Sequence, residues 1–343
     1  MSKPRRKQQA RKPPLAPLHP AEVEALNRAF YAGEPADFLR RRLRSLITIA
    51  ASSDAEERAE ARAHRYGKLE LTTPSIATEP ADEKGRARYL AIETEMLLHH
   101  ASETLLRTFL AHRGRPDVPW LETAKLRGLG EFKKEIRKLA HGEETERLRV
   151  EVGEVWTGRN EAPDADRDRW REAVDRIADY LSFVAQLLLE RAGSYNAAKH
   201  GLAVQPGDSS IKLMGVDGVE ASGPGLAYLS ENLSDGKRFT VVTNRWLDIE
   251  RDLTLVYVIA QLLDGLWSVA RIRYLGWPIP EGGLAVGPAV ALSEVIEASQ
   301  TDVQRESGIR LEAMAFPPAM FSPPGSGADA LQPEAPGPGP SEA

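Results

Sequence analysis

The chain has 343 residues, of which 42% are hydrophobic and 28% are charged, and its net charge at pH 7 is −5. This length and apolar content are sufficient for one large globular domain or two smaller ones. The sequence contains no cysteine. Disulfides and cysteine-based zinc or iron–sulfur sites are therefore excluded, and His, Asp and Glu are the side chains left to bind a metal.

The first 20 residues contain six basic residues and no acidic one. They lack the apolar stretch of about 7 to 15 residues that a secretory signal needs. We therefore interpret residues 1–20 as a basic disordered arm and expect a cytoplasmic protein. Residues 21–311 are acidic in sum, which disfavours extended binding to duplex DNA, because such binding rests on a basic surface that neutralises phosphates.

Three segments carry strong helical signals. Residues 86–112 are rich in helix-forming residues and contain neither Gly nor Pro. Apolar residues recur every three or four positions over 164–200, so one side of this helix is predicted to face a core. Residues 250–275 are apolar except for one narrow polar stripe, which predicts a central helix. Its longest apolar run is shorter than the ~20 residues needed to span a bilayer, so no membrane segment is expected.

The remaining segments complete the predicted fold. Residues 148–158 contain three valines and are predicted as a short strand or an irregular segment. Between about 210 and 245, β-rich segments alternate with turn-forming ones, which predicts a three-stranded antiparallel meander. Residues 312–343 are rich in proline, and we expect them to be a disordered tail. We therefore expect a mainly α protein, a helical bundle over 21–311 with a small inserted antiparallel three-stranded β-sheet.

The end of the predicted helix 164–200 carries the candidate site. Asn196 and His200 are four residues apart, next to Tyr195, and share one helix face. This Asn-x-x-x-His arrangement, over about 86–200, resembles the HEPN superfamily of helical domains, many of which are RNases or inactive partners of RNases. In the family's nucleases, the His and an arginine act on the 2′-hydroxyl and the phosphate of RNA, in a site formed by two protomers. The resemblance therefore implies a catalytic site in a homodimer, with His200 as the catalytic His and Asn196 as the polar residue of the motif.

One position departs from the pattern of the family's nucleases, because Tyr195 stands where they have an arginine. A tyrosine does not supply the permanent positive charge that stabilises a phosphoryl transition state. Four basic residues are candidates for replacing that charge and for binding a ligand: Arg191, Lys199, Arg271 and Arg273. Lys199 and His200 also suit the end of an ordinary helix, where basic side chains interact with the exposed carbonyls.

Glu95 and His99 form a second candidate pair on the helix 86–112. They begin a ladder with Glu103 and Arg107 at every fourth position. Because the pair lies beside apolar positions, it is predicted to be half-buried and available to a ligand. A di-iron bundle would need Glu and His three residues apart on two helices, and no second copy is present, so neither a metal nor another cofactor is expected.

These observations favour a helical binding module without catalysis. We expect it to hold an RNA or a protein partner and to take part in RNA metabolism or defence. Two alternatives remain open at this point. One is a metal-independent endoribonuclease that uses His200, because a general acid or base needs such a group. The other is a scaffold for protein interactions.

Overall fold

The computed structural model describes residues 18–51, 64–66, 69–71, 83–126, 129–142, 145–158, 167–199, 204–212, 220–234, 237–278, 287–288, 290–298 and 311–316. They divide into two compact units. The helical unit comprises the described residues within Met1–Ala51, Leu97–Arg191 and Glu250–Ser299, and the sheet unit those within Ser52–Met96, Ala192–Ile249 and Gln300–Ala343. This division differs from the single domain that we expected over 21–311. One boundary between the units lies inside the long helix α4, between Met96 and Leu97. No Gly or Pro marks this position in the sequence, so the sequence did not indicate the boundary.

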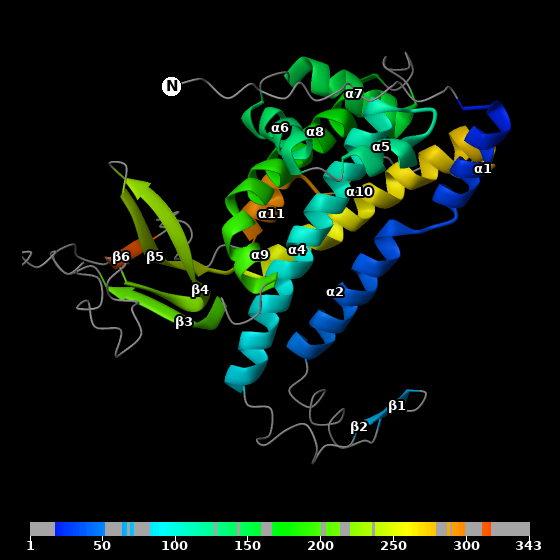
Figure 1. The fold of residues 1–343 in the computed structure, drawn as a ribbon. Coiled ribbons are helices and arrows are strands. Elements are labelled where there is room, and N and C mark those ends of the chain that lie inside the picture. The colour runs from blue at the N-terminus through cyan, green and yellow to red at the C-terminus, as the bar shows by residue number, and fades with distance from the viewer. Residues whose placement is uncertain are drawn as a thin grey trace, which may run out of the picture. The chain divides into compact units, whose positions relative to one another are not determined.

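Helices are the regular secondary structure of the described part of the helical unit, and short turns and connections join them (Figure 1). In chain order they are α1 (Pro20–Tyr31), α2 (Pro35–Ala51), the second half of α4 (Glu83–Gly114), α5 (Pro119–Lys125), α6 (Leu129–His141), α7 (Thr145–Thr157), α8 (Arg167–Glu190), α10 (Ile249–Leu275) and α11 (Leu292–Ala298). The predicted mainly α fold with an inserted antiparallel sheet is confirmed.

Several helix ends follow from local sequence. Pro20 and Pro119 occupy the first turns of α1 and α5, where the missing N–H of proline costs no helical hydrogen bond. Gly158 (φ 72°) and Gly276 (φ 66°) lie just beyond α7 and α10 in the left-handed region, which glycine adopts without the steric penalty of a Cβ atom. These four residues define where the helices begin and end.

Helix α10 lies in the core of the helical unit, as its apolar surface predicts. The Leu262 carbonyl accepts a hydrogen bond from Trp156 Nε1 at 2.9 Å, so α7 packs against α10. The polar stripe of α10 faces α2, where Arg40 Nη2 donates to Asp264 Oδ1 at 2.9 Å. By length and composition α10 could cross a membrane, but 67% of its most apolar stretch is buried within the protein, which is typical of a core helix.

The segment 148–158 is largely helical, and the prediction of a strand or irregular segment was wrong. It forms most of α7, whose Leu148, Val152 and Trp156 recur every fourth residue and are all buried. That helical spacing outweighs the β propensity of the valines, because propensity depends on how the side chains pack.

The helix predicted over 164–200 is two helices. Helix α8 ends at Glu190, and α9 (Ala192–Lys199) begins after a turn at Arg191. The Arg191 N–H still donates to the Leu187 carbonyl at 2.9 Å. The helical hydrogen bonding therefore continues to Arg191, and a new helix then begins in the sheet unit.

An antiparallel sheet dominates the sheet unit (Figure 1). The strands β3 (Val204–Lys212), β4 (Glu220–Ser234) and β5 (Lys237–Trp246) form the predicted three-stranded insert, which is longer than the expected 210–245. Strand β6 (Leu311–Phe316) pairs antiparallel with β5 as a fourth strand, although most of it falls in the tail predicted from 312 onward. Strands β1 (His64–Tyr66) and β2 (Leu69–Leu71) form a separate hairpin. The rest of the predicted arm and tail, 1–17 and 317–343, lies outside the described residues.

Helices cover one face of this sheet, as we expected for a sheet too small to be stable with both faces in water. Their shared core consists of Ala91, Ala197, Ala198, Val204, Leu226, Tyr228 and Leu247. These residues come from α4, from α9, from β3 and β4, and from the segment after β5. The sheet therefore holds α9 in place.

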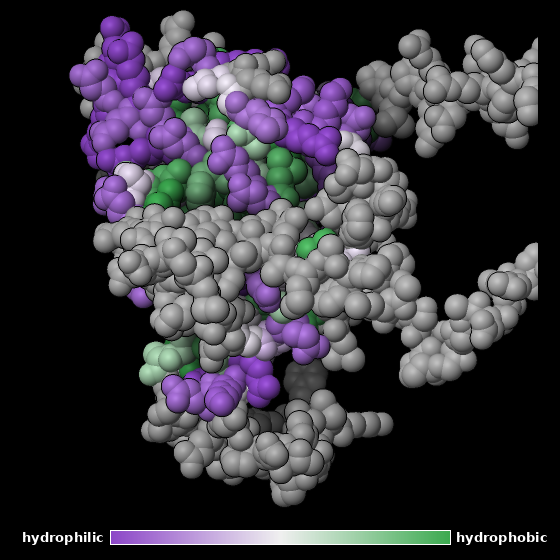
Figure 2. Space-filling model, turned by 90° about the vertical axis from the view of Figure 1, so that its left-hand side faces the viewer, coloured by the Kyte–Doolittle hydropathy of each residue, from purple (hydrophilic) through white to green (hydrophobic). Residues whose placement is uncertain are grey.

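The surface agrees with the amphipathic pattern of the outer helices. In Figure 2, hydrophilic residues cover much of the coloured surface, and apolar residues show in a band between them. Helix α6 illustrates the arrangement, because Phe132, Ile136 and Leu139 are buried while Lys133 and Lys134 are exposed.

Candidate binding site

Helix α9 presents part of the predicted site to solvent. Ala197 and Ala198 are buried in the core of the sheet unit, whereas Asn196 and Lys199 are exposed. Tyr195 is half-buried. His200 lies outside the described residues. The structure therefore places Asn196 and Lys199 on the solvent side of one short, well-anchored helix.

The close approach of α9 to the sheet depends on Gly193. A Cβ atom at this position would lie 3.2 Å from Tyr228 Cε2 and 3.3 Å from the Tyr228 hydroxyl oxygen. Such distances are shorter than ordinary van der Waals contacts, so any larger residue would push the Tyr228 ring away. Glycine lets α9 lie directly against β4, which limits the movement of Asn196 and Lys199.

Glu95 anchors α9 from the other side. It is fully buried, and Ser194 Oγ donates a hydrogen bond to its Oε1. The pair was predicted to be half-buried and open to a ligand, but His99 also is only 9% exposed. Both side chains are therefore buried rather than half-buried. The Glu95–Ser194 hydrogen bond therefore has a structural role.

The rest of the ladder on α4 forms a local ion pair. Arg107 Nη2 lies 2.6 Å from Glu103 Oε1, and its guanidinium lies 4.0 Å from the centre of the Phe132 ring. These contacts fix α4 against α6. Among the described residues, no group of three or more His, Asp or Glu side chains is arranged to hold a metal ion.

Arg191 is committed to a buried ion pair. Its Nη1 and Nη2 donate to the two carboxylate oxygens of Asp252 at 2.6 and 2.8 Å. Arg191 is 2% exposed and Asp252 is completely buried, with Arg251 as a further partner at 3.2 Å. The two-point geometry satisfies both planar groups. The charge of Arg191 is therefore neutralised inside the helical unit.

Arg271 also has a structural role. It donates to the Tyr31 carbonyl at 2.9 Å and to the Gly33 carbonyl at 3.0 Å, and its Nη1 lies 3.3 Å from Glu34 Oε1. Its guanidinium lies 4.7 Å from the centre of the exposed Trp277 ring. These contacts tie the turn between α1 and α2 to the end of α10.

Arg273, by contrast, is exposed and lines a cleft of about 380 Å³. The cleft lies within the helical unit, between the end of α4, the end of α7 and the last turns of α10. Its lining residues are His112, Arg113, Pro116, Glu154, Val155, Gly158, Val269, Ala270, Arg273 and Tyr274. This volume is within the range of about 300–1,000 Å³ that small-molecule sites occupy.

No family model, curated protein or solved structure matches this chain.

His112 is the residue at the cleft that sequence reasoning missed. Burial lowers the pKa of its imidazole from 6.5 to about 4, against the opposing hydrogen bond to the Thr108 carbonyl and with help from the charge of Arg273. The ring is therefore neutral at pH 7. The Thr108 carbonyl, 2.7 Å from Nδ1, accepts only, so the proton lies on Nδ1.

The other ring nitrogen of His112 accepts from Tyr31. The Tyr31 hydroxyl lies 3.0 Å from Nε2, and burial raises the pKa of Tyr31, with the nearby Tyr274 acting in the same direction. Both groups are thus uncharged and satisfied at neutral pH. The signal for His112 in the sequence was weak, because its helical spacing from Leu105 and Thr108 marks only a buried position, and Tyr31 is 81 residues away.

Proposed function

We propose that the protein is a non-catalytic, HEPN-like binding module that holds single-stranded RNA at the exposed side of α9. The observation that carries the proposal is that α9 is anchored through Ala197 and Ala198 while Asn196 and Lys199 face solvent. An amide offers donors and an acceptor to base edges and sugar hydroxyls, and an ammonium attracts phosphates. A surface held in this way binds with little loss of side-chain and backbone freedom.

The surroundings of Arg191 support binding without cleavage. Phosphoryl transfer needs a cation that meets the charge developing on the phosphate. Arg191 is engaged by Asp252 and so does not serve as that cation. Arg271 is likewise engaged by its hydrogen bonds to backbone carbonyls. Tyr195 supplies no cation in the family's arginine position.

The proposal is tested by fluorescence anisotropy with a labelled single-stranded RNA and the full chain. We expect the variant Asn196→Ala/Lys199→Glu to bind about tenfold more weakly than the wild type, because it loses an amide contact and reverses a charge. Lys133→Glu is the matched control, since Lys133 is exposed on α6 and the charge change is the same. Residues 1–20, with their six basic residues, are present in every protein compared. Their attraction for RNA is therefore the same in each protein and does not affect the comparison.

Equal affinity of the double variant and the Lys133→Glu control would contradict binding at α9. Incubation of the wild type and of His200→Ala with a mixed RNA pool, in the presence of a chelator, tests for cleavage. Turnover by the wild type that disappears in His200→Ala would replace the binding module with a metal-independent RNase.

A further inference from the structure

The cleft at Arg273 has a floor that is already organised. His112 Nδ1 donates to the Thr108 carbonyl and His112 Nε2 accepts from Tyr31. The Tyr31 ring stacks on Tyr274, with 5.7 Å between ring centres and 3° between ring planes. His112 and Tyr274 line the cleft, and because the buried Tyr31 contacts both, a ligand entering the cleft meets rings that are held in place. Such preorganisation lowers the entropy lost on binding.

One part of the cleft wall is apolar. Val155 from α7 and Val269 and Ala270 from α10 line it together with Gly158. Gly158 has φ 72°, and nothing lies within 4 Å of the position where its Cβ would be, so this side of the cleft is open. This part of the wall suits an apolar side chain rather than a strongly hydrated group.

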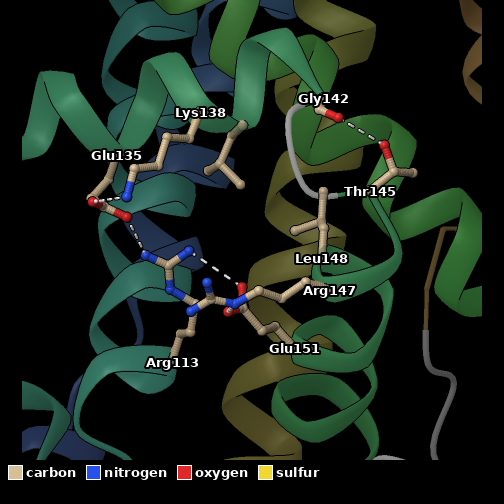
Figure 3. A pocket seen from close by; sticks show the side chains of 9 residues that line it. Arg113, Glu135, Lys138, Gly142, Thr145, Arg147, Leu148 and Glu151 are labelled. Atoms are coloured by element: carbon tan, nitrogen blue, oxygen red, sulfur yellow. Dashed lines mark hydrogen bonds and ion pairs between the residues drawn. The ribbon is translucent and has the colours of Figure 1, made fainter.

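Arg113 is one of the two basic residues at the cleft, and its charge is occupied. Figure 3 shows its guanidinium between two carboxylates, with Nη2 2.5 Å from Glu135 Oε2 and Nη1 3.3 Å from Glu151 Oε2. Lys138 also lies 3.0 Å from Glu135. Although burial alone would raise the pKa of Glu135, the hydrogen bonds and charges of Lys138 and Arg113 lower it. This network holds Arg113 away from a ligand.

Arg273 is differently placed. Arg273 Nη1 donates a long hydrogen bond of 3.5 Å to the Glu154 carbonyl, and the guanidinium lies 5.5 Å from the centre of the Tyr274 ring. Within the described part of the chain, neither the Arg273 guanidinium nor the Glu154 carboxylate takes part in an ion pair. One cation and one anion thus stand at the rim of the same cleft, both exposed.

We infer that this cleft binds a small zwitterion, an α-amino acid with an apolar side chain. Arg273 receives the carboxylate through its paired N–H donors, which match a carboxylate in geometry. Glu154 receives the ammonium group. Val155, Val269 and Ala270 enclose the side chain above the ring of His112. This site lies wholly in the helical unit and uses none of the residues proposed to hold RNA.

Isothermal titration calorimetry of the full chain with L-phenylalanine tests this inference, with 3-phenylpropionate and 2-phenylethylamine as ligands that lack one charge each. We expect saturable binding of phenylalanine, and binding weaker by about tenfold for each of the other two, because each leaves one rim charge without a partner. The ring protons of His112 should shift in NMR spectra on addition of phenylalanine, which locates the ligand at the floor.

Two substitutions separate the rim charges. Arg273→Met and Glu154→Gln should each weaken phenylalanine binding by about tenfold, whereas Arg169→Met, the same change at an exposed position of α8, should leave it unchanged. All three positions are exposed, and circular dichroism confirms folding. Absence of saturable binding by the wild type, equal affinity for phenylalanine and 3-phenylpropionate, or insensitivity to both rim substitutions would each overturn the inference.

Discussion

The two ends of helix α10 bury polar groups in different ways. Near its N-terminus, the carboxylate of Asp252 is completely buried and pairs with the buried guanidinium of Arg191. Near its C-terminus, Trp267 contacts Tyr31 and His112, which are both neutral at pH 7 and share one hydrogen bond. This core therefore keeps a full charge where an opposite charge is buried beside it, and keeps the polar group neutral elsewhere.

The difference follows from the cost of removing charge from water. A buried ion without a partner costs several kcal/mol, so it is retained only with a partner of good geometry. Asp252 also lies in the first turn of α10, where the helix dipole favours negative charge. His112 has no carboxylate among its hydrogen-bond partners in the described residues, and its pKa is lowered instead.

The largest loss of stability is expected at the N-terminal end of α10, which holds the buried Arg191–Asp252 ion pair and which we call the charged end. Arg191→Met leaves the Asp252 carboxylate buried with Arg251 as its remaining ion-pair partner in the described residues, 3.2 Å away, and should lower the free energy of unfolding by about 3–5 kcal/mol. Urea unfolding followed by tryptophan fluorescence measures it, since five of the six tryptophans belong to the helical unit.

The double variant Arg191→Met/Asp252→Leu is the control for that prediction. It removes both charges, so its stability should return to within about 1–2 kcal/mol of the wild type, because a buried ion pair contributes little net energy over apolar side chains. A single variant as stable as the wild type would show that Asp252 reaches water and that the charged end is not enclosed.

At the C-terminal end of α10, where His112 and Tyr31 are neutral and which we call the neutral end, the expected change in stability depends on pH. The pKa of His112 is about 4 in the folded protein and 6.5 ordinarily, so between these values the unfolded chain binds more protons. The stabilisation of the folded protein that depends on a neutral His112 is thus fully present above pH 6.5. It is lost as the pH falls toward 4, which lowers the free energy of unfolding by an amount on the order of 3 kcal/mol.

This pH dependence is measured by urea unfolding at several pH values in the wild type and in His112→Gln, which does not titrate. The difference in unfolding free energy between the two should shrink as the pH falls from 6.5 to 4. An NMR titration that places the pKa of His112 near 6.5 would remove the neutral end from the comparison, because the imidazole would then be open to water.

A smaller effect is expected from Tyr31→Phe. This change removes the hydroxyl that donates to His112 Nε2 and leaves a buried acceptor without that donor, so the unfolding free energy should fall by about 1–2 kcal/mol. The NMR pKa of His112 should also move in this variant. A stability equal to that of the wild type would show that water replaces the hydroxyl.

The smallest effect is expected midway along α10, at the ion pair of Arg40 and Asp264. Both side chains are more than a third exposed, at 37% and 43%, so solvent weakens their attraction. Arg40→Met should lower the unfolding free energy by less than about 1 kcal/mol. A loss as large as that of Arg191→Met would show that burial is not what distinguishes the two ion pairs.

Particular elements show how far the sequence predicts this fold. The helix at 86–112 was predicted because helix-forming residues without Gly or Pro favour a helix locally. The central position of 250–275 was predicted because a helix that is apolar on nearly every side is buried. The segment 148–158 was misjudged because its valines suit a strand as well, and only the neighbours of Leu148 and Trp156 decide between the two. Strand β6 was missed because its pairing partner, β5, is far away in the chain.

The sequence by itself determined the largely helical character of 86–112, 164–200 and 250–275, where the inserted sheet lies and that Asn196 and Lys199 end a helix beside apolar positions. The tertiary structure decided which polar side chains are enclosed. Arg191 meets Asp252 across 61 positions and Ser194 meets Glu95 across 99. Local spacing governs the face of a helix because backbone geometry repeats every few residues. The partner that such a face meets depends on how the whole chain packs, and no local pattern records it.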